Sequence, residues 1–295
     1  MRRAPLASTV LVLACNAGGD ADDTDLQAGV DAEQAITFRA VVGDETWRCA
    51  ANYENIGKTK ATASFGDLKL YVHDLVALLP DGTEQPVELA DDAPWQGEGV
   101  ALLDLEDGTG SCAVQGDTAL RSEVIGTFRD DAVGLRLTVG VPDALNVGPA
   151  DDTSTPPLDR DDLLVNATSG FRYLRTVVIT GGTGRWPVEI FDVWGTDPAT
   201  GDPRELQDAQ VQITLPGFRA ADDAVLVDLA VLLSDSDPTT NFSTTPAGST
   251  RPQVSPEGCQ MTPGDQDCTG IFRHYGLGGV AADFLRVGPL DPTGP

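Results

Sequence analysis

The amino-acid sequence predicts an all-β protein, a β-sandwich of mainly antiparallel strands. Three observations indicate this fold class: apolar residues alternate with polar ones in short runs, turn-forming residues separate these runs, and few segments show the apolar stripe of a helix. Alternation with a period of two places apolar side chains on one face of a strand. Two sheets that bury such faces against each other form a sandwich.

The predicted strands follow one another along most of the chain. Each is a short run in which apolar residues recur at every second position, and the runs cover residues 36–42, 68–72, 100–102, 133–141, 211–215 and 225–233. Clusters such as Pro80-Asp81-Gly82 and Glu106-Asp107-Gly108 separate them, and 32 glycines and 20 prolines supply further breaks.

Two long loops and one helical turn complete the predicted architecture. Residues 142–162 and 234–258 are rich in Pro, Asp, Thr and Ser, and long loops in compact domains are often functional. A short C-terminal helical turn is expected from Asp267 to Tyr275, ended by Gly276, since glycine suits a left-handed cap.

The N-terminus has the order of an export signal. Met1-Arg2-Arg3 is basic, residues 4–14 are apolar and Cys15 follows. The apolar run is shorter than the ~20 residues that cross a bilayer core. Val12-Leu13-Ala14-Cys15 also matches a lipobox, so residues 1–15 are expected to be a lipoprotein signal peptide with lipid on Cys15; an ordinary signal peptide cut nearby is the alternative.

An exported chain with one lipid anchor has a restricted set of locations. We expect a periplasmic or outer-membrane lipoprotein, with the cell surface as a further option, that meets the membrane through the lipid anchor only. Residues 16–35 are small and acidic and are expected to form a disordered tether. Residues 36–295 are expected to form a single β-sandwich domain, with two small domains as the alternative.

The charge balance restricts the partners. The chain has 19 Lys and Arg against 46 Asp and Glu, a formal net charge of -27, which repels phosphate backbones. Nucleic acid is therefore excluded as a partner. The acidic surface could attract cations or a basic protein, although solubility alone explains most of these carboxylates.

The cysteines indicate disulfide bonds. Apart from Cys15, the chain has Cys49, Cys112, Cys259 and Cys268, an even number in an exported protein. Two disulfides are expected, and no Cys-x-x-Cys pair suggests a zinc site. The chain also has no Gly-x-Ser-x-Gly elbow, no His-Glu-x-x-His and no c-type haem motif, so we do not expect an enzyme.

Several segments, read in order, resemble the MbnP-like proteins, the four-Cys members of a metallo-mystery pair. They lie within residues 36–277 and include residues 38–43, 70–75, 94–96, 100–108, 140–142, 170–173 and 258–261, together with the four cysteines. The resemblance implies an exported copper-binding partner and substrate of an MbnH-like diheme c-type cytochrome peroxidase of the MauG type. That peroxidase oxidises a partner tryptophan to kynurenine. A diverged, non-metal surface-binding or structural module is the alternative.

The chain departs from the family pattern at the positions that carry this chemistry. Val165 and Ala167 stand where the family usually has two tryptophans, and Asn146-Val147 stands where it commonly has Asn-His. Another histidine and an extra cysteine of the family are missing near Gly184-Arg185. The scaffold is retained more completely than the site.

The resemblance also indicates which cysteines are expected to pair and which residues could bind copper. It places Cys49 and Cys112 beside strands that a sandwich brings together, and Cys259 lies close to Cys268, so we expect these two pairs. The remaining copper donors are His73, Met261 and His274.

Each copper donor has a plainer interpretation. His73 is expected on the face of its strand opposite Leu68, Leu70 and Val72, where a partly exposed histidine needs no ligand role. His274 can interact with the last carbonyls of the helical turn. Met261 can fill the core.

Tryptophans and acidic turns offer further candidates. The candidate redox residues are Trp95, Trp186 and Trp194; Trp95 can instead pack beneath a strand, and Trp186 or Trp194 could substitute for the missing pair. The acidic turns at residues 104–108 and 197–202 have closely spaced oxygens that could hold Ca²⁺. Solvated turn carboxylates are the alternative.

Overall fold

The computed structural model describes residues 29–113, 116–146, 155–166, 169–180, 188–194, 209–240, 243–244, 253–254, 258–259 and 267–291. Cys15, Met261, Ala167, Trp186 and the acidic turn at residues 197–202 lie outside the described residues, as does the side chain of Trp194. Among the described residues, no helix is long and apolar enough to cross a membrane.

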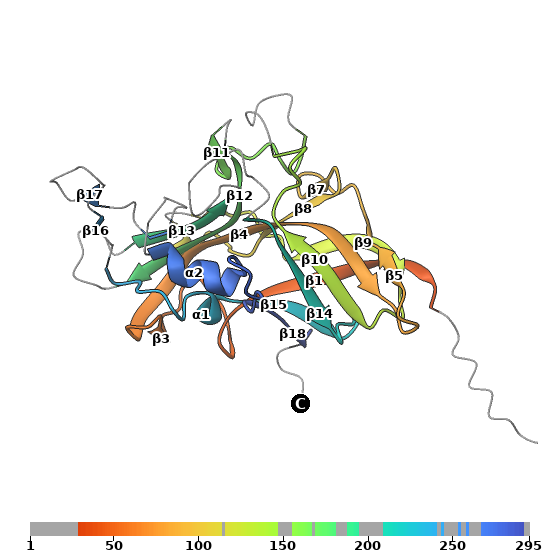
Figure 1. The fold of residues 1–295 in the computed structure, drawn as a ribbon, viewed down its shortest axis with the longest axis horizontal. Helices are drawn as coiled ribbons and strands as arrows, with labels where there is room; N and C mark the ends of the chain where they lie inside the picture. Colours follow the sequence, from red (N-terminus) through yellow and green to blue (C-terminus); the bar gives the residue numbers. More distant parts are fainter. Residues whose placement is uncertain are drawn as a thin grey trace, which may run out of the picture.

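The fold consists of two large sheets and a few short elements (Figure 1). The first sheet has the order β18-β15-β1-β9-β6, with β2 paired to β1. The pair of β1 and β15 is parallel, and the other pairs of this sheet are antiparallel. Its strands are β1 (Asp31–Val42), β2 (Glu45–Thr46), β6 (Glu88–Leu89), β9 (Glu123–Arg129), β15 (Asp223–Asp228) and β18 (Leu285–Pro289).

The second sheet is built around the long strand β4 (Ala61–Leu78), in the order β11-β12-β4-β10-β14. β13 pairs with β12, while β3, β5 and β8 pair with β4, and β7 pairs with β8. The other strands are β3 (Tyr53–Ile56), β5 (Glu84–Pro86), β7 (Gln96–Gly97), β8 (Val100–Asp104), β10 (Gly134–Val139), β11 (Leu164–Asn166), β12 (Gly170–Thr180), β13 (Val188–Trp194) and β14 (Val211–Pro216).

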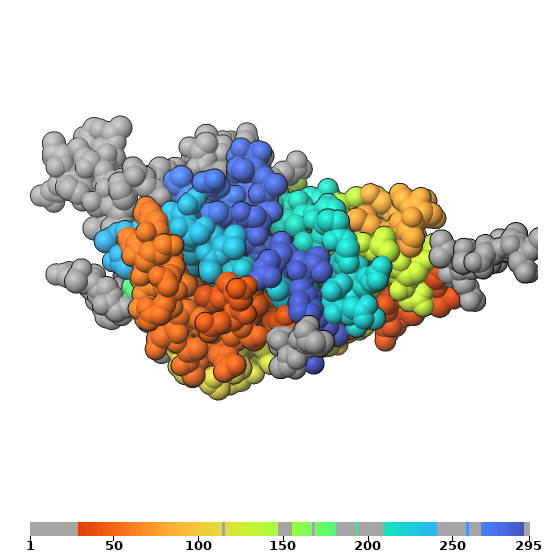
Figure 2. All heavy atoms as spheres, turned by 90° about the horizontal axis from the view of Figure 1, so that it is seen from below, coloured from red at the N-terminus to blue at the C-terminus, as the bar shows by residue number. Residues whose placement is uncertain are grey.

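The remaining elements are short. β16 (Ser243–Thr244) and β17 (Gln253–Val254) form a two-stranded sheet, and a 3-10 turn covers Gly110–Ala113. The helices α1 (Leu229–Leu232) and α2 (Asp267–Tyr275) lie against each other. In Figure 2 the blue C-terminal segment lies between the orange N-terminal segment and the turquoise residues around β14. The expected helix from Asp267 to Tyr275 is confirmed, and Gly276 follows it with a φ of 107°.

The predicted all-β sandwich is confirmed, because apolar faces of both sheets meet in one core. Phe38 and Val225 of the first sheet belong to the same hydrophobic cluster as Leu70 and Leu137 of the second. β14 alternates between buried and exposed residues, as a strand with one covered face should. β4 differs, since its residues are buried without interruption from Ala63 to His73.

Two predicted boundaries need correction. Strand β1 begins at Asp31 and pairs with β9 from there, so the tether expected to reach residue 35 ends earlier. The alternation expected to continue as a strand to Leu233 ends at Asp228. The Asp228 carboxylate accepts hydrogen bonds from the backbone N–H groups of Ala230 and Val231, at 3.0 and 3.3 Å, and thereby caps α1.

The expected disulfide pairs are confirmed. Cys49 is bonded to Cys112 and Cys259 to Cys268. The first bond joins the segment after β2 to the 3-10 turn after β8, and the second joins the chain before α2 to the first turn of this helix. All four cysteines are buried.

Candidate functional site

His73 is buried, which corrects the expectation of a partly exposed strand histidine. Its side chain is 3% exposed. Tyr71, on the same face of β4, donates a hydrogen bond of 3.0 Å to the carbonyl of Pro157, so part of the predicted long loop covers this face. A period of two shows which residues share a face, but it does not show what packs over that face.

The hydrogen bonds of His73 define its tautomer. Gln210 donates through Nε2 to the carboxylate of Asp143 at 2.7 Å, so its Oε1 is the atom that accepts from His73 Nε2, at 2.9 Å. His73 therefore carries its proton on Nε2 when it is neutral. In this tautomer Nδ1 has no proton to donate; it lies 3.1 Å from a carboxylate oxygen of Asp74 and has no hydrogen-bond partner.

His274 belongs to a different network at the end of α2. Its Nε2 lies 2.7 Å from the hydroxyl of Ser234 and its Nδ1 lies 2.9 Å from the carboxylate of Asp283. Asp235 lies 3.3 Å from the same Nε2. Among the described residues, the hydrogen bonds and ion pairs of His274 share no residue with those of His73 and Gln210, so the two histidines belong to separate networks.

The described residues do not fit a copper site. Among them, the groups of three or more candidate metal-binding side chains are Cys49, Glu106 and Cys112, and Asp67, Asp104 and Glu106; neither group contains a histidine. Cys49 and Cys112 share a disulfide and offer no thiolate. Copper prefers imidazole and sulfur donors, whereas three carboxylates suit a hard cation.

Trp95 and Trp47 have packing roles. Trp95 packs against the core, and its carbonyl accepts a hydrogen bond of 2.8 Å from Leu102 in β8. Trp47 is 6% exposed and packs edge-on against Phe65, with ring centroids 6.5 Å apart. Val165, at one of the positions where the family usually has tryptophan, lies in β11.

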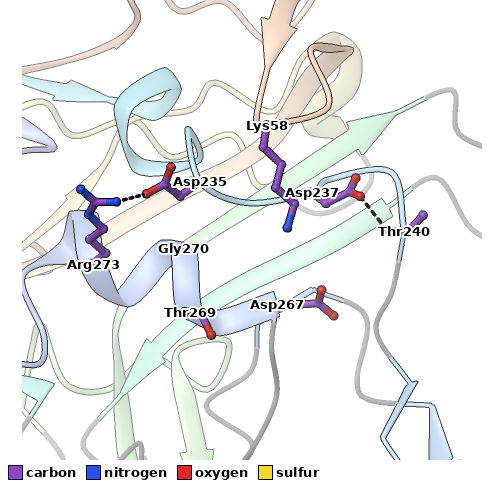
Figure 3. A pocket seen from close by; sticks show the side chains of 8 residues that line it. All are labelled: Lys58, Asp235, Asp237, Thr240, Asp267, Thr269, Gly270 and Arg273. Atoms are coloured by element: carbon purple, nitrogen blue, oxygen red, sulfur yellow. Dashed lines mark hydrogen bonds and ion pairs between the residues drawn. The ribbon is translucent and has the colours of Figure 1, made fainter.

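A pocket of about 560 Å³ lies beside the N-terminal half of α2. Its lining is polar and contains both signs of charge; the residues are Lys58, Asp235, Asp237, Thr240, Asp267, Thr269, Gly270 and Arg273 (Figure 3). Arg273 and Asp235 are paired at 2.7 Å, while the Lys58 side chain extends toward Asp237. The described part of its lining has none of the aromatic side chains that are common in small-molecule sites.

The densest group of charges surrounds Lys69 in β4. Its ammonium nitrogen lies 3.4–3.8 Å from carboxylate oxygens of five residues, and two arginines complete what we call the Lys69 cluster. The members are Asp67, Lys69, Asp104, Glu106, Asp117, Arg160, Asp162 and Arg175.

Neighbouring strands and covering loops assemble the Lys69 cluster. Lys69 and Asp104 are directly opposite each other in the β4–β8 pair. Arg175 of β12 donates to Asp67 at 2.8 Å, and Arg160 donates to Asp117 at 2.9 Å and to Asp162 at 3.0 Å. Asp67, Lys69, Asp104 and Glu106 are buried, whereas Asp117 and Asp162 are about half exposed at the opening.

Burial raises the proton affinities of the three buried carboxylates of this cluster. It raises the pKa of Asp104 to about 8, although Lys69 acts in the opposite direction. Burial also raises the pKa values of Asp67 and Glu106. Burial alone would lower the pKa of Lys69, but the carboxylates of Asp67 and Asp104 raise it above its usual value, so Lys69 stays charged.

Sequence reasoning found only part of this cluster. It identified the acidic turn at residues 104–108, but it treated solvated carboxylates as the alternative to a cation site, and Asp104 and Glu106 are buried. Lys69 was missed. The available signal was a lysine within an otherwise apolar run, between Leu68 and Leu70, because a charge in such a run needs buried partners.

The site and fold together define a disulfide-bonded β-sandwich with buried polar groups on one central strand. The family model described as MbnP matches residues 31–255. The chain belongs to the MbnP family.

One solved structure supports the same fold. MbnP from Methylosinus trichosporium matches with a TM-score of 0.70 at 20% sequence identity, over 89% of this chain and 100% of that chain. No curated protein sequence matches the chain.

Proposed function

We propose that this MbnP-family protein is an exported, non-enzymatic docking partner of an MbnH-like diheme c-type peroxidase, and that it does not carry copper at a complete imidazole site. Family membership supports the partner class. The claim that no complete imidazole copper site is present rests on one observation: His73 and His274 belong to different hydrogen-bond networks.

Charge supports docking to a basic surface. The chain has a formal net charge of -27, so attraction over a distance should speed association with a basic partner and should weaken as salt rises. The test measures binding of the mature chain to a purified MbnH-like diheme peroxidase, at low, physiological and high NaCl. Saturable binding that weakens steadily with salt is expected. Absence of binding at low salt would contradict the docking role.

The same mixture tests the redox substrate role separately. Because Val165 and Ala167 stand where the family usually has tryptophan, we expect docking without efficient conversion of a tryptophan to kynurenine. Intact-mass and peptide analysis after coexpression with the peroxidase checks this expectation. A stoichiometric kynurenine at Trp186 or Trp194 would show that this chain is a substrate and would refute the expectation of docking without modification.

We propose that Cys15 anchors the protein to a membrane by a lipid. The lipobox-like sequence Val12-Leu13-Ala14-Cys15 supports this proposal. The expected result is that wild-type protein sediments with membranes and gains the mass of the acyl groups, whereas Cys15→Ser protein does not. Soluble, unmodified wild-type protein would refute the anchor.

A further inference from the structure

The Lys69 cluster contains carboxylate oxygens that its hydrogen-bond donors do not satisfy. Both carboxylate oxygens of Asp104 and Oδ1 of Asp67 accept no hydrogen bond, although these side chains are only 0% and 1% exposed. The Lys69 ammonium has three N–H donors, and it lies 3.4–3.8 Å from the five carboxylates, farther than the ~2.8 Å of a charge-assisted hydrogen bond. Buried acceptors without a hydrogen bond are costly, so a water molecule, a proton or a cation is expected to satisfy them.

The charges of the cluster also do not balance. Among the described residues, its five carboxylates are paired with Lys69, Arg160 and Arg175, so these eight side chains have an excess of two negative charges when all are ionised. An excess of this size in a buried site is unfavourable unless protons or a cation neutralise it. One divalent cation would supply the missing charge.

The geometry suits such an ion. One oxygen from each of Asp67, Asp104 and Glu106 lies within 4.8 Å of the other two. A point equidistant from three such oxygens is within ~2.8 Å of each, close to the 2.3–2.6 Å of calcium–oxygen bonds. We propose that Asp67, Asp104 and Glu106 form a site for a divalent cation of the calcium class, which competes with the Lys69 ammonium.

Lys69 is the competing cation because it lies 3.5–3.8 Å from the same three residues. An ion held between these carboxylates would repel an ammonium at that distance, so Lys69 must move toward the opening. Asp117 and Asp162 can pair with the displaced ammonium at the opening, since each lies 3.4 Å from the Lys69 nitrogen and is about half exposed. These two residues also provide a polar route from solvent to the buried carboxylates.

This inference goes beyond the docking role and does not depend on it. The first experiment measures the melting temperature of the mature wild-type chain at pH 8, in EGTA and then in excess CaCl₂, with NaCl matched for ionic strength. A reversible rise of about 5 °C is expected when the site is saturated. MgCl₂ should give a smaller rise, since Mg²⁺ demands a tighter octahedral geometry.

Variants separate this site from general binding to an acidic surface. Asp104→Asn keeps the shape of the side chain and removes its charge, so the calcium-dependent rise should disappear. The matched control is Asp44→Asn, at an exposed position, and it should respond like wild type. Lys69→Met removes the competing charge and should tighten calcium binding at least about 10-fold by calorimetry, because a local repulsion is lost.

Three results would contradict a cation site at these carboxylates. No calcium-dependent shift in wild type, equal responses of Asp104→Asn and Asp44→Asn, or weaker binding in folded Lys69→Met would overturn it. If either buried variant does not fold by circular dichroism, Asp162→Asn replaces it. That change at the half-exposed opening removes a resting place for the displaced ammonium, and calcium binding at least about 3-fold weaker than in wild type is then expected. Unchanged binding in this variant would overturn the competition.

Discussion

Four alternate residues of β4 show how single side chains determine the chemistry of this molecule. Asp67, Lys69, Tyr71 and His73 share one strand face, and all four are buried. Their partners come from distant segments, such as Asp162 for Lys69 and Gln210 for His73. The covering loops therefore convert the polar face of a strand into a buried site.

The first prediction at the residue scale concerns copper. Because no histidine lies in a group of three candidate ligands among the described residues, Cu(I) and Cu(II) should bind weakly and below one equivalent at micromolar concentrations. His73→Ala should remove most of what remains, since its Nδ1 is the buried imidazole atom without a hydrogen bond. Competition titrations with chromophoric chelators measure this. Tight stoichiometric binding that survives the substitution would contradict it.

The second prediction at this scale concerns pH. Burial raises the pKa of Asp104 to about 8 from an ordinary value near 3.8, so the folded state holds this proton more tightly than the unfolded state. The proton on Asp104 therefore stabilises the fold fully at pH values below the ordinary pKa of this residue. This stabilisation is lost as the pH rises from there through 8. In EGTA, Asp104→Asn should therefore gain stability relative to wild type between pH 5 and pH 9.

Urea denaturation at several pH values checks this linkage. Asp107→Asn is an informative control, because hydrogen bonds from Thr109 lower the pKa of Asp107. The stability that the Asp107 carboxylate contributes is therefore lost as the pH falls, which is the opposite of the effect at Asp104. A stability difference between Asp104→Asn and wild type that does not vary with pH would refute the assignment.

At the scale of elements, Asp228 joins β1, β15, α1 and β18. Its carboxylate accepts from Gly43 N–H at 3.0 Å, caps α1, and lies 3.4 Å from the guanidinium of Arg286. This one residue ends a strand and begins a helix while it is 2% exposed. The change from strand to helix after residue 228 depends on these contacts, since the alternation of Leu229, Val231 and Leu233 would otherwise allow the strand to continue.

Replacing this cap should have a large effect. We expect Asp228→Ala to lower the free energy of unfolding by roughly 2–4 kcal/mol, because it leaves several buried N–H groups without an acceptor. Asp228→Asn keeps an acceptor of the same shape and should cost less. Equilibrium urea unfolding at pH 7 compares the two variants. Equal losses would mean that charge, and not capping, is what the carboxylate contributes.

At the scale of the whole molecule, two sheets and two disulfides hold the chain together. The Cys49–Cys112 bond spans 63 positions and the Cys259–Cys268 bond spans 9. In the chain-entropy model, closing the longer loop removes more freedom from the unfolded chain. The first disulfide should therefore stabilise the fold more than the second.

The corresponding prediction uses paired alanine variants. Removing Cys49 and Cys112 together should cost roughly 4 kcal/mol, and removing Cys259 and Cys268 roughly 3 kcal/mol. Thermal and urea unfolding give the two values, and non-reducing peptide mapping of wild type verifies the pairs. A larger loss for the second pair would show that its contacts near α2, and not loop entropy, determine its contribution.

Local features of the sequence are sufficient to predict the β-sandwich class, the presence of two disulfides, the C-terminal helix and its end at Gly276. These features depend on signals that can be read along the chain, namely alternation, an even number of cysteines and the conformational freedom of glycine, while the pairing of the cysteines was expected from the family resemblance. Such signals need no knowledge of which distant segments meet. The family resemblance was visible for the same reason, since ordered segments and cysteines can be read along the chain.

The segments that cover β4, and the charges that meet there, depend on long-range packing. His73 and Gln210 are 137 positions apart, and the partners of Lys69 come from β8, from Asp117 and from Asp162. Alternation assigns Lys69 and His73 to one face, but burial depends on segments that pack over that face. Because burial raises the pKa of Asp104 and leaves its oxygens unpartnered, the cation site depends on long-range packing that local sequence does not encode.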